Sequence, residues 1–171
     1  LTKDGTGALF LSGANNYTGA TTISAGIIRA SHASAFGTTA GGITVASGAA
    51  LELTDAITIG AEALTLNGTG ISSGGALRNI SGDNTYAGVI TLASDSRINS
   101  DSGLLTLNVA SGNAITGTFN ITFGGANNIS VADPIDTSTG TLTKDGIGTL
   151  FLSGANNYTG ATTISAGIIR A

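Results

Sequence analysis

Short runs of alternating apolar and polar residues fill most of this chain. Residues 51–53 (Leu-Glu-Leu), 57–59 (Ile-Thr-Ile) and 64–66 (Leu-Thr-Leu) each place aliphatic side chains on one face and a polar side chain on the other. A period of two over so few residues is typical of a half-buried β-strand. Gly, Asn, Asp and Ser separate these runs, and these are the residues that tight turns prefer.

The same pattern predicts strands along the whole chain. No window of ten or more residues shows the apolar stripe and caps of an amphipathic helix, so we expect an all-β fold. The predicted strands are Ala8–Ser12, Ala20–Ser24, Gly26–Ala30, Gly42–Ala46, Ala50–Thr54, Ile57–Ile59, Ala63–Asn67, Ala76–Ile80, Val89–Ala93, Leu104–Val109, Thr118–Phe123, Ile129–Ala132 and Thr149–Leu152.

An internal repeat organises the chain. The segment 1–30 recurs at 142–171 with 28 of 30 positions identical. A weaker echo of the segment 12–19 lies at 81–88. We therefore expect one tandem unit at residues 1–141 and the start of the next at residues 142–171, as a fragment of a longer array.

Tandem repetition of short strands favours a β-solenoid over a sandwich or barrel. A sandwich or barrel closes once, whereas solenoid coils stack on one another and bury a continuous apolar core. Coils of about 20 residues, at the short end of the known repeat periods, would place roughly seven in each tandem unit. At a strand spacing of about 4.8 Å, one unit would rise by about 34 Å.

The composition of the chain argues against some classes of binding partner. Only 9% of the residues are charged, 41% are hydrophobic, and the net charge is −4. An acidic chain without a basic patch disfavours nucleic acid and anionic membranes as partners. No apolar run approaches the ~18 residues of a membrane-spanning helix. Cysteine is absent, which is consistent with export of an unfolded chain.

Residues 3–28 resemble the autotransporter-associated β-strand repeat, also called the passenger-associated transport repeat. The family pattern, roughly K-x-G-x-G-x-L-x-L-S-G-x-N-x-Y-x-G-x-T-x-[IV]-x-x-G-x-L, is present twice, with Ile28 and Ile169 where Leu is usual. Residues 75–92 form a partial third copy. The resemblance implies a right-handed parallel β-helix in the passenger of a bacterial type V secreted protein, displayed outside the outer membrane. The repeat has no catalytic role in the family.

The repeated glycines, asparagines and tyrosines are candidate structural positions of the motif. The asparagines could bind a glycan or a partner chain, but a ladder at the turns is the favoured interpretation, because Asn tolerates left-handed backbone conformations. The tyrosines could stack on carbohydrate, but packing over a corner of the coil is favoured. These positions are Gly13, Asn15, Tyr17, Gly19, Gly26, Gly82, Tyr86, Gly88, Gly154, Asn156, Tyr158 and Gly160.

Phe10 and Phe151 are candidates for a contact surface. Each lies between two leucines, so each points outward if the leucines face the core. An exposed Phe in each unit could contact another chain, or its own chain could cover the ring.

Nothing in the sequence assembles a catalytic, metal or cofactor site. His32 is the single histidine and there is no cysteine, so a histidine-based triad or a zinc site is not expected. Asp133 and Asp136, like Asp95 and Asp101, lie near each other, but neither pair belongs to a calcium-loop motif. An ice-binding face would need paired Thr-x-Thr ranks, and residues 141–143 are an isolated case.

The sequence therefore predicts a non-enzymatic module, a structural or adhesive stalk. Its partners would be neighbouring repeats of the same chain, with like chains in a fibre, other cells, surfaces or glycans as further candidates. Two alternatives stay open. One is an extracellular filament subunit that assembles through solenoid contacts, and the other is a β-helix enzyme acting on polysaccharide.

Overall fold

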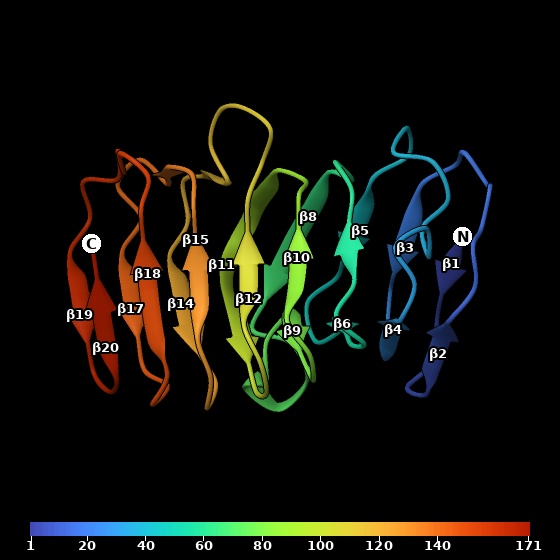
Figure 1. The fold of residues 1–171 in the computed structure, drawn as a ribbon, viewed down its shortest axis with the longest axis horizontal. Helices are drawn as coiled ribbons and strands as arrows, with labels where there is room; N and C mark the ends of the chain where they lie inside the picture. The colour runs from blue at the N-terminus through green and yellow to red at the C-terminus, as the bar shows by residue number, and fades with distance from the viewer.

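The computed structural model describes residues 1–171 as a stack of short parallel β-strands (Figure 1). This confirms the all-β solenoid. No helix is present that is long and apolar enough to cross a bilayer. The elements are β1 (Thr2–Lys3), β2 (Ala8–Leu11), β3 (Thr21–Ile23), β4 (Ile27–Ala30), β5 (Ile43–Val45), β6 (Ala50–Leu53), β7 (Thr58–Ile59), β8 (Leu64–Gly68), the 3-10 turn η1 (Ile71–Ser73), β9 (Leu77–Asn79), β10 (Asn84–Tyr86), β11 (Ile90–Ser100), β12 (Leu105–Leu107), β13 (Ile115–Gly117), β14 (Ile121–Gly124), β15 (Ile129–Val131), β16 (Ile135–Asp136), β17 (Leu142–Lys144), β18 (Thr149–Leu152), β19 (Thr162–Ile164) and β20 (Ile168–Arg170).

The strands form three columns that run along the shaft. Each strand pairs in parallel with the equivalent strand of the next coil, so the chain winds around a common axis in about eight coils. Column I contains β1, β3, β5, β8, the first part of β11, β13 and β16. Column II contains β2, β4, β6, β9, the last part of β11, β14, β17 and β19. Column III contains β7, β10, β12, β15, β18 and β20.

The coils differ in length. In column I, Thr2 is followed in register by Thr22, Thr44, Thr65, Thr91, Thr116 and Asp136. The step from Thr65 to Thr91 is the longest of these, and it includes the turn around η1 between β8 and β9. The next step includes the loop after β12, which projects from the stack in Figure 1. The unit of residues 1–141 thus spans a little more than six coils, close to the roughly seven expected.

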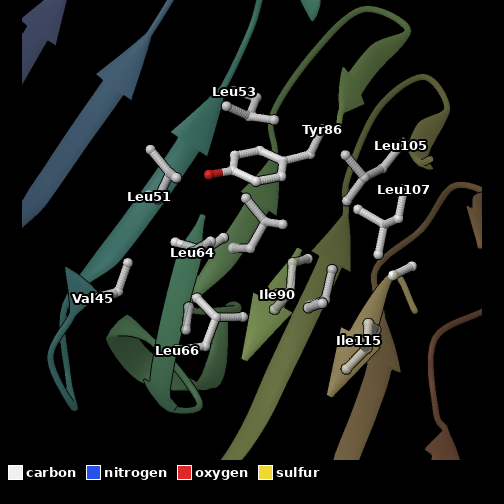
Figure 2. Packing of buried hydrophobic residues seen from close by; sticks show 14 of the residues in the cluster. Val45, Leu51, Leu53, Leu64, Leu66, Tyr86, Ile90, Leu105, Leu107 and Ile115 are labelled. Carbon is white, nitrogen blue, oxygen red and sulfur yellow. The ribbon is translucent and has the colours of Figure 1, made fainter. Parts of the chain in front are cut away.

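Inward-facing aliphatic side chains form the core between the columns. A single cluster of 32 buried hydrophobic residues runs through the shaft. Figure 2 shows part of it, with the Tyr86 ring among the leucines of β6 and β8 and with Ile90 and Ile115 further along. Because each coil contributes the same kind of inward residue, each interior coil is covered by its two neighbours.

Candidate functional site: the repeat motif and the outward faces

The repeated lysine lies inside a corner of the coil. Lys3 is 8% exposed, and its Nζ donates hydrogen bonds to the carbonyl oxygens of Asp4 (2.8 Å), Gly5 (2.6 Å) and Ala25 (3.1 Å). Lys144 is 1% exposed, and its Nζ donates to the carbonyl oxygen of Gly146. The ammonium group therefore satisfies main-chain carbonyls that face away from water.

Burial changes the acidity of this lysine in the second copy. Desolvation lowers the pKa of Lys144; the neighbouring carboxylate of Asp145 opposes that shift and the positive charge of Arg97 adds to it. The Lys144 ammonium thus lies between the carbonyl oxygen of Gly146 and the charges of Asp145 and Arg97, where it stabilises the corner of the coil.

A glycine of the following coil closes each lysine corner. Gly26 has φ +72°, and a Cβ there would overlap the carbonyl oxygen of Gly7 and approach Lys3 Nζ at 2.7 Å. Gly167 is the equivalent residue in the second copy, with φ +75°, and a Cβ there would overlap the carbonyl oxygen of Gly146. The glycine is required both for the left-handed turn and for the close approach of the two coils. This contact accounts for the spacing from the lysine to the last glycine of the motif.

The asparagines of the motif bond to the main chain of a neighbouring coil. Asn15 Nδ2 donates to the carbonyl oxygen of Ala35 at 2.8 Å. Asn156 Oδ1 accepts from the Ile135 amide at 2.9 Å, and Asn84 Oδ1 accepts from the Ile57 amide at 2.7 Å. These bonds join coils at places where the strand ladders are interrupted. The side chains are therefore engaged within the shaft.

The three motif tyrosines lie in two different environments. The Tyr17 hydroxyl is 3.0 Å from Thr21 Oγ1, and the Tyr158 hydroxyl is 2.9 Å from Thr162 Oγ1. Tyr86 is instead fully buried in the core. Burial, with a smaller contribution from the charge of Glu62, raises the pKa of Tyr86 well above its usual value of 10.0.

Close contact between coils also explains other motif glycines. A Cβ at Gly88 would overlap the carbonyl oxygen of Glu62, and one at Gly160 would overlap that of Gly140. A Cβ at Gly82 would lie 2.6 Å from the Ala56 nitrogen, and one at Gly154 would overlap the main chain at Asp133. Gly13 and Gly19 lie in the first coil, and a Cβ at either would meet nothing within 4 Å.

The two candidate phenylalanines each lie beside an arginine of the next coil. Phe10 is 62% exposed, and the Arg29 guanidinium lies 5.4 Å from its ring centroid. Phe151 is half-buried, and the Arg170 guanidinium lies 6.0 Å from its ring centroid. This distance and placement fit a cation–π contact, so each ring is already in contact with its own chain.

A row of ion pairs continues from this arginine along column II. Arg29 Nη2 lies 2.6 Å from Glu52 Oε2, and Glu52 is 1% exposed. Arg78 bridges Glu52 Oε1 at 3.3 Å and Asp101 Oδ2 at 2.5 Å. Further along, Arg97 forms a bidentate pair with Asp145 at 2.6 and 2.7 Å. We name Arg29, Glu52, Arg78 and Asp101 the ionic row.

The ionic row has no motif in the sequence. Arg29 and Glu52 are far apart in the chain, and they become neighbours only once the register of β4 and β6 is known. The only signal in the sequence was the polar residue at the centre of each Leu-x-Leu-like run. The row neutralises acids that could otherwise have been considered for acid–base chemistry.

A row of threonines occupies the outward face of column I. Thr2, Thr22, Thr44, Thr65, Thr91 and Thr116 are register partners on successive coils. The hydroxyls of Thr91 and Thr116 lie 3.3 Å apart. We name these six residues the threonine row. The threonine row has no Thr-x-Thr pattern in the sequence, because each coil contributes a single threonine to it.

The remaining polar candidates are also engaged locally. His32 Nδ1 accepts a hydrogen bond from the Ser34 amide at 3.0 Å. Asp133 Oδ2 accepts from the Val109 amide and Asp95 Oδ1 from the Asn120 amide. No pocket opens in the surface, and no three His, Cys, Asp or Glu side chains gather into a metal-binding group.

The fold and the repeat define a class, that of parallel β-solenoids built from tandem repeats. Residues 1–30 and 142–171 both match the family model of the passenger-associated-transport-repeat. Both copies of the repeated segment are thus similar to this repeat.

One curated relative matches nearly all of the chain. It is the adhesin BmaC autotransporter of Brucella suis biovar 1 (strain 1330), which is 34% identical over 170 residues. The match covers 99% of this chain and 4% of that protein, so the chain corresponds to a small part of the relative's length. No solved structure matches the chain.

Proposed function

We propose that this chain is a length of rigid shaft in the passenger of a bacterial autotransporter adhesin, displayed outside the cell. Its task there is structural. It holds the binding region of the parent protein at a distance from the outer membrane, and it performs no catalysis. The shaft contributes to adhesion through this reach.

The continuous stacking of the coils is the observation that carries the proposal. A single apolar core runs through the shaft, and within each of the three columns every strand pairs in parallel with the next. Each coil is held by its two neighbours, so the stability of such a stack grows with the number of coils. At about 4.8 Å per coil, one tandem unit extends the shaft by about 30 Å. Adding or removing units would therefore change length without changing architecture.

The outward chemistry supports the same role. The charges of the ionic row are paired, the motif asparagines bond to neighbouring coils, and the motif phenylalanines lie beside arginines. The repeated residues therefore hold the shaft together. The likeness to an adhesin autotransporter, together with the transport repeat, supports the extracellular location.

The test is to excise residues 1–141 from the parent protein on the bacterial surface and to image the shafts by electron cryo-microscopy. We expect shafts shortened by about 30 Å that keep their binding region at the tip. Adhesion should persist on purified ligand and fall only where reach limits contact. Unchanged length would contradict the proposal, and bundled shafts would favour the filament alternative. A loss of polysaccharide cleavage on excision would favour the enzyme alternative.

A further inference from the structure

The two near-identical copies of the repeat occupy different columns of the shaft. β1 and β3 of the first copy lie in column I, whereas their equivalents β17 and β19 lie in column II. β2 and β4 lie in column II, whereas β18 and β20 lie in column III. The second copy of the motif is therefore displaced by one column relative to the first.

The asparagine–tyrosine segment moves in the same direction. In the first copy the Asn15 amide donates to the Ser34 carbonyl, which lies between β4 of column II and β5 of column I, on the third face. In the second copy the equivalent residue, Asn156, accepts a hydrogen bond at Oδ1 from the Ile135 amide, and Ile135 belongs to β16 of column I. All three parts of the motif are thus shifted by one column, so the second copy is rotated and not distorted.

Coil length is the cause of this rotation. Six coils separate Thr2 from Asp136, its last register partner in column I. The residue that occupies the same motif position as Thr2 in the second copy is Thr143, seven positions after Asp136. The step from Thr2 in column I to Ala8, the first residue of β2 in column II, is nearly the same, six positions. The unit of residues 1–141 is therefore six coils and one face long.

We propose that successive tandem units of this repeat turn by one face about the shaft, so that the surface of a unit is presented in three directions by three successive units. The inference rests on the strand registers and not on the adhesive role.

The two outward rows already show the turn within this chain. The threonine row ends in column I, where Asp136 follows Thr116. A new row of threonines, Thr122, Thr143 and Thr163, runs in column II. Likewise, the pair of Phe10 and Arg29 lies in column II, and its equivalent, Phe151 and Arg170, lies in column III.

The turn determines what kind of contact the shaft can make. The threonine row of column I continues for one unit, and a new row then begins in column II. Column III of the same unit carries a shorter row, Thr58, Thr85 and Thr106. A straight neighbouring shaft would therefore meet the same outward surface of a unit only once in every three units. Small identical partners could bind to successive units from three sides. The arrangement opposes lateral bundling of long flat β-faces, which is a recognised hazard of regular β-structure.

Engineered disulfides in this chain test the rotation between tandem units. The chain has no native cysteine, and register partners about 4.8 Å apart satisfy disulfide geometry. The decisive pairs are Thr116→Cys with Asp136→Cys, and Thr116→Cys with Thr143→Cys. The rotated arrangement predicts nearly complete oxidation of the first pair and almost none of the second. Oxidation of the second pair instead of the first would overturn the proposal.

A second set of pairs tests the long coil that produces the turn. Thr65→Cys with Thr91→Cys should cross-link, and Thr65→Cys with Thr85→Cys should not, because Thr85 lies in column III. Coils of uniform length would reverse this result and remove the rotation. Thr44→Cys with Thr65→Cys is the positive control, because these residues are partners in a regular coil. If the control forms and the Thr65 and Thr91 pair does not, the proposal is wrong.

Discussion

The hydroxyl of Tyr86 donates a hydrogen bond of 2.9 Å to the main-chain carbonyl oxygen of Glu62, one coil earlier in the shaft. Both residues are buried, with Tyr86 fully buried and Glu62 3% exposed. The bond satisfies a carbonyl that water does not reach. It also places an ionisable hydroxyl and an ionisable carboxyl in the same buried region, so both should affect how stability varies with pH.

Replacing Tyr86 by Phe should destabilise the chain by about 1–2 kcal/mol at neutral pH, because the carbonyl of Glu62 loses its partner. The folded state keeps Tyr86 protonated above its usual pKa of 10.0, so this group's contribution is full below pH 10 and is lost as the pH rises further. The difference in free energy of unfolding between wild type and variant, measured by urea unfolding, should therefore become smaller above pH 10. Tyr158→Phe is the matched control, because Tyr158 is only half-buried in this chain. An equal loss there would contradict the explanation.

The Glu62 carboxyl should limit stability at neutral pH. Burial raises its pKa, and a hydrogen bond from the Gly42 main chain opposes that shift. A raised folded-state pKa gives stability that is full below the usual value of 4.5 and is lost as the pH rises through the folded value. Glu62→Gln should remove this loss and be more stable than wild type at pH 7. Urea unfolding at pH 4 and pH 7 measures the difference, with the exposed Asp55→Asn as control. A less stable Gln variant at pH 7 would refute the prediction.

Alanine at Gly88 or Gly160 should prevent correct stacking, whereas alanine at Gly19 should be tolerated. The three glycines occupy the same place in the motif, but a Cβ at Gly88 or Gly160 would overlap a main-chain carbonyl of the preceding coil. Main-chain atoms cannot move aside as a flexible side chain can, so we expect a loss of roughly 3 kcal/mol or more. Thermal unfolding followed by circular dichroism measures it. Similar melting temperatures for all three variants would show that the overlap is relieved without cost.

Much of the fold could be predicted because each coil buries its inward aliphatic side chains in the same way. Alternation in residues 51–53 and 64–66 identified inward aliphatic positions, and the recurrence of residues 1–30 indicated a stack. Several short strands were missed, namely β1, β10, β13, β16, β17, β19 and β20. β10 reads Asn-Thr-Tyr and carries no aliphatic residue, so its inward positions, Asn84 and Tyr86, have no hydrophobic pattern. β11 extends past the expected Ala93 to Ser100, because it runs through a corner where no glycine marks a turn.

The outward rows could not be predicted, because they depend on coil length. A sequence period indicates only the average coil, and the average hides the long steps from Thr65 to Thr91 and from Thr91 to Thr116. Each such coil changes which outward residues become neighbours further along. Tyr86 illustrates the same limit in the core. Its motif is shared with Tyr17, but only in the middle of the stack do the residues of β6 and β8 enclose the ring.

Removing Glu52 and removing Arg29 from the ionic row should change the stability of the chain by different amounts. Glu52 is almost completely buried, while the side chains of Arg29 and Arg78 are 33% and 36% exposed. Removing Arg29 leaves a buried carboxylate with one weaker partner, and breaking a buried pair from one side is destabilising. Removing the carboxylate leaves two arginines that reach water.

We therefore expect Arg29→Met to cost about 2–3 kcal/mol and Glu52→Gln to cost less, about 1 kcal/mol. The double variant should be no less stable than Arg29→Met alone, because it no longer has the buried charge. A double-mutant cycle in urea measures the coupling energy between the two side chains. Arg170→Met is the matched control, since Arg170 contacts Phe151 as Arg29 contacts Phe10 but has no ion pair in this chain. If Arg170→Met cost as much as Arg29→Met, the contact with the ring, and not the carboxylate, would hold the arginine in place.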